Sequence, residues 1–244
     1  MRRPAAVLLA AVLVATGCAG AAGGTTLTVF AAASLTESFG ALEHRFEADH
    51  PGVDVRLNLG GSARLAQQIA EGAPADVFAA ADPEAMRRAG ERVAEPAVFA
   101  TNRLTVVVAP GNPLGVTGLA DLARPDVTTV VCAPRVPCGA AAQRLAALAG
   151  APLRPASEEQ DVKAVLNKVR VGAADAGLVY VTDAPVAAGA VDTVEIPAAE
   201  RVVNDYPIAV LRDAPAGELA RAFVDLVLGP VGREELAARG FGTP

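Results

Sequence analysis

The sequence is poor in several of the residues on which catalytic and metal-binding proteins rely. Its 244 residues include no tryptophan, two tyrosines, two histidines and three cysteines. The two histidines, His44 and His50, lie in or just after one polar, helix-forming stretch. Because a metal cation needs clustered ligands, this placement disfavours a metal site. We expect no metal cation and no cofactor.

Positive charge is also scarce. The chain has 21 lysines and arginines against 27 aspartates and glutamates, which gives a formal net charge of −6. Proteins that bind nucleic acids concentrate basic residues on one face, so a nucleic acid partner is disfavoured. An anion site on this chain would have to use local dipoles and hydrogen-bond donors, because long-range attraction is unfavourable.

The apolar run near the N-terminus is short. It spans residues 7–14 after Arg2 and Arg3, whereas a transmembrane anchor, the alternative, needs about 20 apolar residues. The run leads to Ala15-Thr16-Gly17-Cys18, and the whole segment resembles a lipoprotein signal, which is cleaved before a lipid-modified cysteine. We therefore expect residues 1–17 to be the signal peptide, Cys18 to be lipidated and residues 18–26 to be a tether. The protein would then lie outside the cytoplasm, anchored to the cell membrane.

The two other cysteines, Cys132 and Cys138, are separated by Ala-Pro-Arg-Val-Pro. An exported protein meets an oxidising environment, and the prolines could fold this loop back, so a disulfide is one possibility. Two small buried thiols are the other. The sequence leaves both open, because the separation of the two Cα atoms decides the matter.

Short apolar runs alternate with amphipathic stretches of helical length, which is typical of βα units and a largely parallel sheet. Polar segments at Thr101-Asn102-Arg103 and Asn204-Asp205-Tyr206 each precede a strand, and we interpret them as two crossings between two lobes. Lobe 1 is predicted to comprise residues 27–104 and 206–244, and lobe 2 residues 105–205. The predicted strands are 27–31, 53–59, 76–80, 104–109, 128–132, 176–181, 191–196 and 207–211.

Four turns each follow an extended segment and open a predicted helix. The N-terminus of a helix presents backbone N–H groups without internal partners and a positive dipole end, so it can bind an anion. Paired glycines in one turn would let the backbone approach a bound group closely. The turns are Ala32-Ala33-Ser34-Leu35, Gly60-Gly61-Ser62-Ala63, Pro137-Cys138-Gly139-Ala140 and Glu159-Gln160-Asp161-Val162.

Each of these residues also has a purely structural interpretation. Ser34, Ser62 and Asp161 could cap helices, since serine and aspartate are favoured at such positions. Tyr180 could be a half-buried strand residue whose hydroxyl bonds a backbone carbonyl. Taken singly, capping is favoured for Ser34, Ser62 and Asp161, although the paired glycines before Ser62 shift the balance there toward a ligand.

Taken in series, these segments resemble the molybdate-binding proteins of ABC importers. The likeness runs in order from Leu27 to Phe241, nearly the whole chain that would remain after cleavage. The segments that carry it are Thr28–Thr36, Gly60-Gly61-Ser62, Gly72–Phe78, Val136-Pro137-Cys138-Gly139, Asp161-Val162 and Gly177-Leu178-Val179-Tyr180.

The resemblance implies the type II periplasmic-binding-protein fold, with two α/β lobes joined by two hinge crossings and a ligand cleft between them. It implies a binding protein rather than an enzyme, which carries molybdate or tungstate to an ABC importer permease and its ATPase. Such a carrier has no evident need to self-associate, so we expect a monomer. The implied ligands are the hydroxyls of Ser34, Ser62 and Tyr180 and the backbone N–H groups of Cys138 and Val162.

Two positions depart from the family pattern. Cys138 stands where alanine is common, but the implied contact is a backbone N–H, which any side chain leaves in place. Arg64, close after Ser62, could reach the mouth of the cleft or simply be a solvated helix residue.

Other functions remain as alternatives. A carrier of sulfate or another tetrahedral oxyanion is the nearest. A cell-surface serine hydrolase would need a base beside Ser34 or Ser62, and a ferric-ion carrier would need clustered tyrosines or carboxylates. The sequence supplies neither in an evident form.

Overall fold

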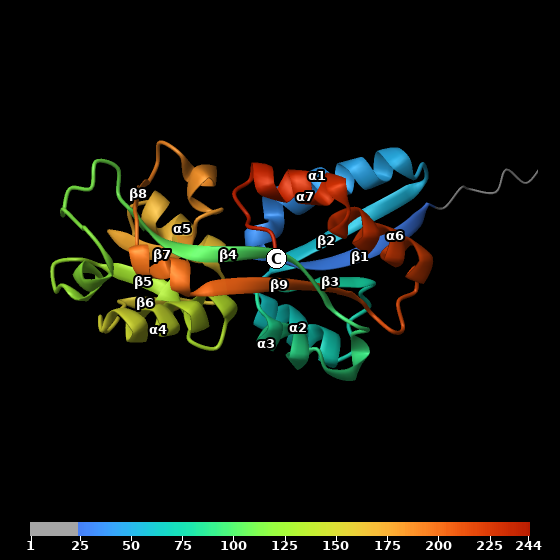
Figure 1. Cartoon of the computed structure of the whole chain (residues 1–244), viewed down its shortest axis with the longest axis horizontal. Coiled ribbons are helices and arrows are strands. Elements are labelled where there is room, and N and C mark those ends of the chain that lie inside the picture. Colours follow the sequence, from blue (N-terminus) through green and yellow to red (C-terminus); the bar gives the residue numbers. More distant parts are fainter. Residues whose placement is uncertain (1–23) are drawn as a thin grey trace, which may run out of the picture.

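The computed structural model describes residues 24–244 as an elongated molecule of two α/β lobes (Figure 1). The predicted signal peptide (residues 1–17), Cys18 and most of the predicted tether lie outside the described residues. Among the helices of residues 24–244, none combines the length and the apolar character needed to cross a bilayer.

The first lobe is built on a sheet in which β1 lies between β2 and β3, parallel to both, while β9 runs antiparallel to β3. Helices α1, α6 and α7 pack together on one face, and α2 and α3 cover the other (Figure 1). The elements are β1 (Thr25–Ala32), α1 (Thr36–Asp49), β2 (Val53–Gly60), α2 (Ser62–Ala70), β3 (Val77–Ala79), α3 (Pro83–Arg88), β9 (Val203–Val210), α6 (Gly217–Leu228) and α7 (Pro230–Ala238).

In the second lobe, β5 pairs in parallel with β6 and β7, and β7 pairs antiparallel with β4. Helices α4 and α5 lie on opposite faces of these strands (Figure 1). The elements are β4 (Ala97–Val108), β5 (Thr129–Cys132), α4 (Pro137–Ala149), β6 (Ser157–Glu159), α5 (Val162–Arg170), β7 (Ala176–Tyr180) and β8 (Asp192–Val194). Short 3-10 helices are η1 (Ala33–Leu35), η2 (Gly90–Arg92), η3 (Leu119–Ala123), η4 (Ala184–Ala187) and η5 (Pro197–Arg201).

Two long strands, β4 and β9, run from one lobe into the other. They pair antiparallel with each other from Ala97 to Arg103, and β4 then continues beside β7 from Leu104 to Val108. The predictions that these strands begin at residues 104 and 207 were wrong, since they begin at Ala97 and Val203. Polar residues inside the strands caused the error, because they interrupt the apolar pattern. The division into lobes at these crossings stays a prediction.

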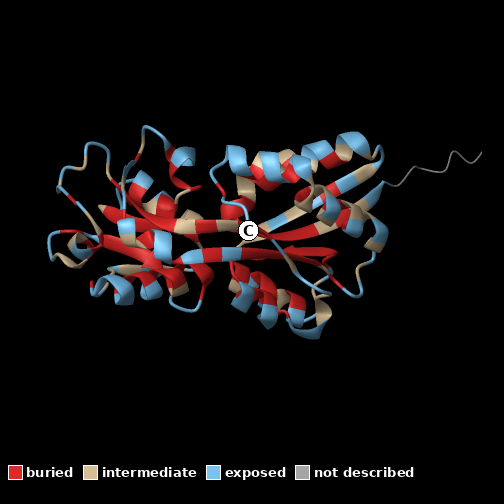
Figure 2. Cartoon of the chain, in the orientation of Figure 1, coloured by how far each residue is buried: buried red, intermediate tan, exposed pale blue. Residues whose placement is uncertain are grey.

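Aromatic packing fixes α1 against the sheet and against α6. Phe39 contacts Phe99 of β4 and Phe223 of α6, with ring centroids 6.0 Å apart in each pair. Phe46, further along α1, meets Phe223 at 5.4 Å. These rings are buried, as are most residues of both sheets (Figure 2). The first turns of α1 are therefore held against β4 and α6.

Candidate functional site

A small cavity lies where four segments, two from each lobe, meet. The turn after β1, the start of α2, the start of α4 and the start of α5 all line it, together with the end of β7. Its volume is about 20 Å³. Because a single water needs roughly 10–15 Å³ of such space, the cavity suits a ligand of a few atoms and excludes a sugar or a peptide. All five residues predicted as ligands line it: Ser34, Ser62, Cys138, Val162 and Tyr180.

Ser62 is the first residue of α2 and does not cap it. Gly61 holds the N-cap position, and no side chain bonds the helix N-terminus there. The Ser62 Oγ atom instead accepts a hydrogen bond of 3.0 Å from the backbone N–H of Ala81. The capping interpretation is therefore wrong for this serine, and its hydroxyl hydrogen stays available to the cavity.

Ser34 lies in the short helix η1 before α1 and does not act as a cap either. Its Oγ atom is 2.9 Å from the hydroxyl of Tyr206, which is fully buried in β9. Tyr206 lies edge-to-face against Tyr180, with ring centroids 5.9 Å apart. Tyr206 was not predicted as part of the site, because it lies far from Ser34 in the sequence and the two residues meet only in the folded chain.

Tyr180, at the end of β7, is buried rather than half-buried. Its hydroxyl is 2.9 Å from the Asn204 Nδ2 atom, not from a backbone carbonyl as the structural interpretation required. Burial raises the pKa of Tyr180, so its hydroxyl remains a neutral hydrogen-bond donor at physiological pH.

Asp161 does cap α5, as the structural interpretation predicted. Its Oδ1 atom accepts a hydrogen bond of 2.9 Å from the N–H of Ala164. Val162 is the first residue of α5 and Cys138 is the second of α4. Their N–H groups belong to first turns, which have no carbonyl partner within the helix.

Cys132 and Cys138 form a disulfide, with their Cα atoms 5.7 Å apart. This pairing decides between the two states that the sequence left open. The bond joins the end of β5 to the first turn of α4, so it closes the loop that presents the Cys138 N–H to the cavity.

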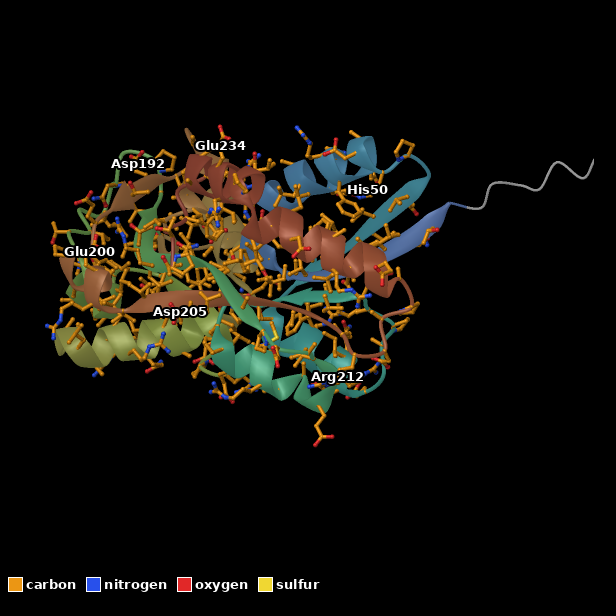
Figure 3. All side chains as sticks on the ribbon, turned by 45° about the vertical axis from the view of Figure 1, so that its right-hand side comes forward. His50, Asp192, Glu200, Asp205, Arg212 and Glu234 are labelled. Atoms are coloured by element: carbon orange, nitrogen blue, oxygen red, sulfur yellow. A yellow bond between two sulfur atoms is a disulfide. The ribbon has the colours of Figure 1, made fainter. Side chains whose placement is uncertain are left out.

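The histidines and Arg64 lie away from this cavity. His50 stacks on Phe46 at the end of α1, with ring centroids 4.0 Å apart, on the periphery of the first lobe (Figure 3). His44 is exposed, and so is Arg64; none of the three lines the cavity. Neither serine therefore has a histidine base, which removes the basis of the hydrolase alternative. Among residues 24–244, no group of His, Cys, Asp and Glu residues could hold a metal ion.

The two lobes are in contact around the cavity. Gly61 packs against the backbone carbonyl of Gln160. Lys163 of α5 forms ion pairs with Glu37 of α1, at 2.8 Å, and with the fully buried Asp183, at 3.2 Å. The structure therefore shows the closed arrangement of the two lobes.

Asp183 is expected to make stability depend on pH. Burial raises its pKa from 3.8 to about 6, although Lys163 opposes the shift. Because the folded state favours the protonated acid, this contribution is full below pH 3.8 and is lost as the pH rises through about 6.

Urea unfolding of the wild type and of Asp183→Asn, at several values between about pH 4 and 7, measures this effect. The asparagine variant should gain on the order of 2–3 kcal/mol of unfolding free energy relative to the wild type across that range. If the free energies of unfolding of the two proteins change in parallel with pH, the pKa of Asp183 is the same in the folded and the unfolded state.

Comparison with known proteins agrees with this arrangement. Residues 27–242 match the family described as bacterial extracellular solute-binding protein. The chain is 46% identical over 225 residues to molybdate-binding protein ModA of Mycobacterium tuberculosis H37Rv, a match that covers 91% of this chain and 86% of that protein.

Two solved structures share the fold at lower identity. The periplasmic molybdate-binding protein of Azotobacter vinelandii superposes with a TM-score of 0.75 and 20% identity, covering 89% of this chain and 99% of that one. The sulfate-binding protein SubI of M. tuberculosis H37Rv gives a TM-score of 0.74 and 20% identity, covering 89% and 86%. At this identity both show the fold alone, and they confirm the predicted α/β binding-protein architecture.

The family match covers nearly all of the described chain, and its members bind and carry solutes rather than transform them. The prediction that this protein is not an enzyme is thereby confirmed. The chain belongs to the bacterial extracellular solute-binding protein family and resembles the molybdate-binding proteins within it across nearly its whole length.

Proposed function

We propose that this protein captures molybdate in the cavity between its lobes and delivers it to the permease of an ABC importer. The observation that carries the proposal is the convergence of three hydroxyls and two first-turn N–H groups on one cavity of about 20 Å³. The 46% identity to a protein called molybdate-binding protein ModA supports this ligand over others.

The lining suits a dianion although it contains no basic side chain. The starts of α2, α4 and α5 direct N–H groups and positive dipole ends at the cavity. Hydrogen bonds to a charged group contribute about 1.5–3 kcal/mol each, whereas association costs about 4–15 kcal/mol. Tight binding therefore needs nearly all of the donors at once, and only the closed lobes supply them together.

Selectivity has two physical sources. Sulfate is smaller than molybdate, so a cavity closed around molybdate holds some donors too far from the oxygens of sulfate. Phosphate at neutral pH carries a proton that needs an acceptor, and the hydroxyls and N–H groups of the cavity leave that proton unpaired as long as they all donate. Asp161 is the one carboxylate in the lining, and its Oδ1 atom caps α5. Tungstate has the charge and nearly the size of molybdate, and we expect it to bind as well.

The way the protein would deliver molybdate depends on ligand contacts made by both lobes. A ligand that bridges the lobes favours the closed state over an open one, as in other hinge-closing proteins. We propose that β4 and β9 form the hinge between the predicted lobes, and that the closed monomer docks on the permease while the ATPase drives import. Lipidation at Cys18 would hold the carrier at the outer face of the cell membrane, near that permease.

Isothermal titration of the protein with molybdate, tungstate, sulfate and phosphate at neutral pH tests this function. We expect binding of molybdate and tungstate at submicromolar concentration and little binding of the other two. A preference for sulfate would indicate a sulfate carrier, like SubI, instead of a molybdate carrier. No binding of any of the four anions would refute oxyanion capture.

Removing single hydroxyls should weaken binding without unfolding the protein. Ser34→Ala and Tyr180→Phe each delete one donor, and each is expected to cost about 1–3 kcal/mol, or roughly 5–150-fold in Kd for molybdate. Titration measures the loss, and thermal unfolding without ligand serves as the control for folding. Unchanged titration curves for both variants would show that these hydroxyls are not ligands.

A further inference from the structure

Two of the three hydroxyls of the cavity, those of Ser62 and Tyr180, each accept a hydrogen bond from the protein. For Ser62 the donor is the backbone N–H of Ala81, at 3.0 Å. A backbone N–H can only donate, so the Ser62 oxygen must accept and its hydrogen must point elsewhere. An isolated hydroxyl would rotate to donate or accept as the ligand requires.

Asn204 of β9 imposes the same polarity on Tyr180. Its Oδ1 atom accepts a hydrogen bond of 2.9 Å from the guanidinium of Arg144, which can only donate. Its Nδ2 atom donates to the Ala81 carbonyl at 3.0 Å, which can only accept. These two partners fix the orientation of the amide, and Nδ2 therefore also donates to the Tyr180 hydroxyl at 2.9 Å. Tyr180 is left with its hydrogen directed away from Asn204.

Asn102 of β4 contacts Tyr206, which lies beside Ser34. The Asn102 Oδ1 atom accepts from the Arg103 N–H at 2.9 Å, which places Nδ2 near Thr182 at 2.8 Å and near the Tyr206 hydroxyl at 3.4 Å. The Tyr206 hydroxyl lies 2.9 Å from the Ser34 Oγ atom, and either oxygen can be the donor. These contacts therefore do not fix the direction of the Ser34 hydrogen, in contrast to those of Ser62 and Tyr180.

We propose that Asn204 is a specificity-determining positioning residue, which holds the hydroxyl of Tyr180 as a donor and thereby excludes oxyanions that carry a proton. Asn204 is buried and faces the buried Asn102 in the β4–β9 ladder, where the lobes join. The inference deepens the proposed function and rests on it. It explains how the neutral Tyr180 hydroxyl, which could otherwise accept a hydrogen bond from hydrogen phosphate, is held as a donor.

Asn204→Asp tests this inference with almost no change of shape. A carboxylate can only accept, so Arg144 stays paired, the Ala81 carbonyl loses its donor, and the Tyr180 hydroxyl turns to donate to the new carboxylate. The cavity then loses a donor and gains an acceptor at Tyr180. We expect the ratio of Kd for hydrogen phosphate to Kd for molybdate to fall at least about tenfold relative to the wild type.

Two controls separate this effect from charge and from misfolding. Arg64→Gln changes the charge near the cavity by the same amount at an exposed residue that does not line it, so it should weaken both anions alike and leave the ratio unchanged. In a Tyr180→Phe background, which has no hydroxyl to redirect, Asn204→Asp should no longer change the ratio. Thermal unfolding without ligand shows whether the Asn204→Asp protein is folded. If it is not, Asn204→Ser, which also removes the fixed amide donor, is measured in its place.

The outcomes distinguish the inference from the proposed function. A wild type that binds sulfate instead of molybdate overturns the proposed ligand, and the ratio is then measured against sulfate. An unchanged ratio in Asn204→Asp, in a wild type that binds either dianion, overturns the role of Asn204. A wild type that binds none of these anions overturns both.

Discussion

Gly61→Ala is expected to weaken molybdate binding by about 100-fold while leaving the protein folded. A Cβ atom at Gly61 would lie 2.3 Å from the Gln160 carbonyl oxygen across the cleft. That oxygen belongs to the backbone, so the clash is relieved only when the lobes separate. Overpacking of this kind costs roughly 1–3 kcal/mol or more, and about 3 kcal/mol corresponds to about 100-fold in Kd.

Gly40→Ala is the control, because it adds the same methyl group inside α1, at a residue that does not line the cavity. An added Cβ there would meet no atom within 4 Å. Titration should show nearly wild-type affinity for Gly40→Ala and the large loss for Gly61→Ala, and thermal unfolding should show that both ligand-free proteins are folded. Equal affinities would mean that ligand binding does not require the closed contact seen here.

Gly139→Ala is expected to lower the free energy of unfolding by about 3 kcal/mol, at the upper end of overpacking effects. Its Cβ would lie 1.9 Å from the Ala133 carbonyl oxygen and 2.6 Å from that of Cys132. Both oxygens are backbone atoms at the end of β5, and the disulfide prevents the loop from moving far. The start of α4 must therefore shift, which also displaces the Cys138 N–H from the cavity.

Gly40→Ala provides the contrast for this second variant. Gly40 lies inside α1, where an added Cβ would meet no atom within 4 Å. Replacing a helical glycine by alanine under these conditions stabilises by roughly 0.5–1 kcal/mol. Urea unfolding should therefore show opposite signs for the two glycine-to-alanine changes. Destabilisation by both would indicate that the close packing at Gly139 is not the cause.

The positions of four of the five candidate ligands could be predicted because the signals are local. Ser34, Ser62, Cys138 and Val162 each lie at or near the start of a helix, and the ends of parallel strands bring such turns to one edge of a sheet. Tyr180 could be identified by resemblance alone. The sequence did not decide between capping and the cavity for the serines, because that choice depends on Ala81 and Tyr206, which are distant along the chain.

The second layer of the site was missed for the same reason. Asn102 and Asn204 were interpreted as polar residues of hinge crossings, and they shortened the predicted strands. In the fold they are buried inside β4 and β9, where they bond Thr182, Tyr206 and Tyr180. A buried asparagine needs such partners, but the partners come from other strands and leave no local pattern.

The central claim is tested most directly by the crystal structure of the protein grown with molybdate, with anomalous data collected at the molybdenum absorption edge. We predict one molybdenum peak in the cavity, with its oxygens within hydrogen-bond distance of the Ser34, Ser62 and Tyr180 hydroxyls and the Cys138 and Val162 N–H groups. An empty cavity, or a peak elsewhere on the protein, would contradict the proposed site.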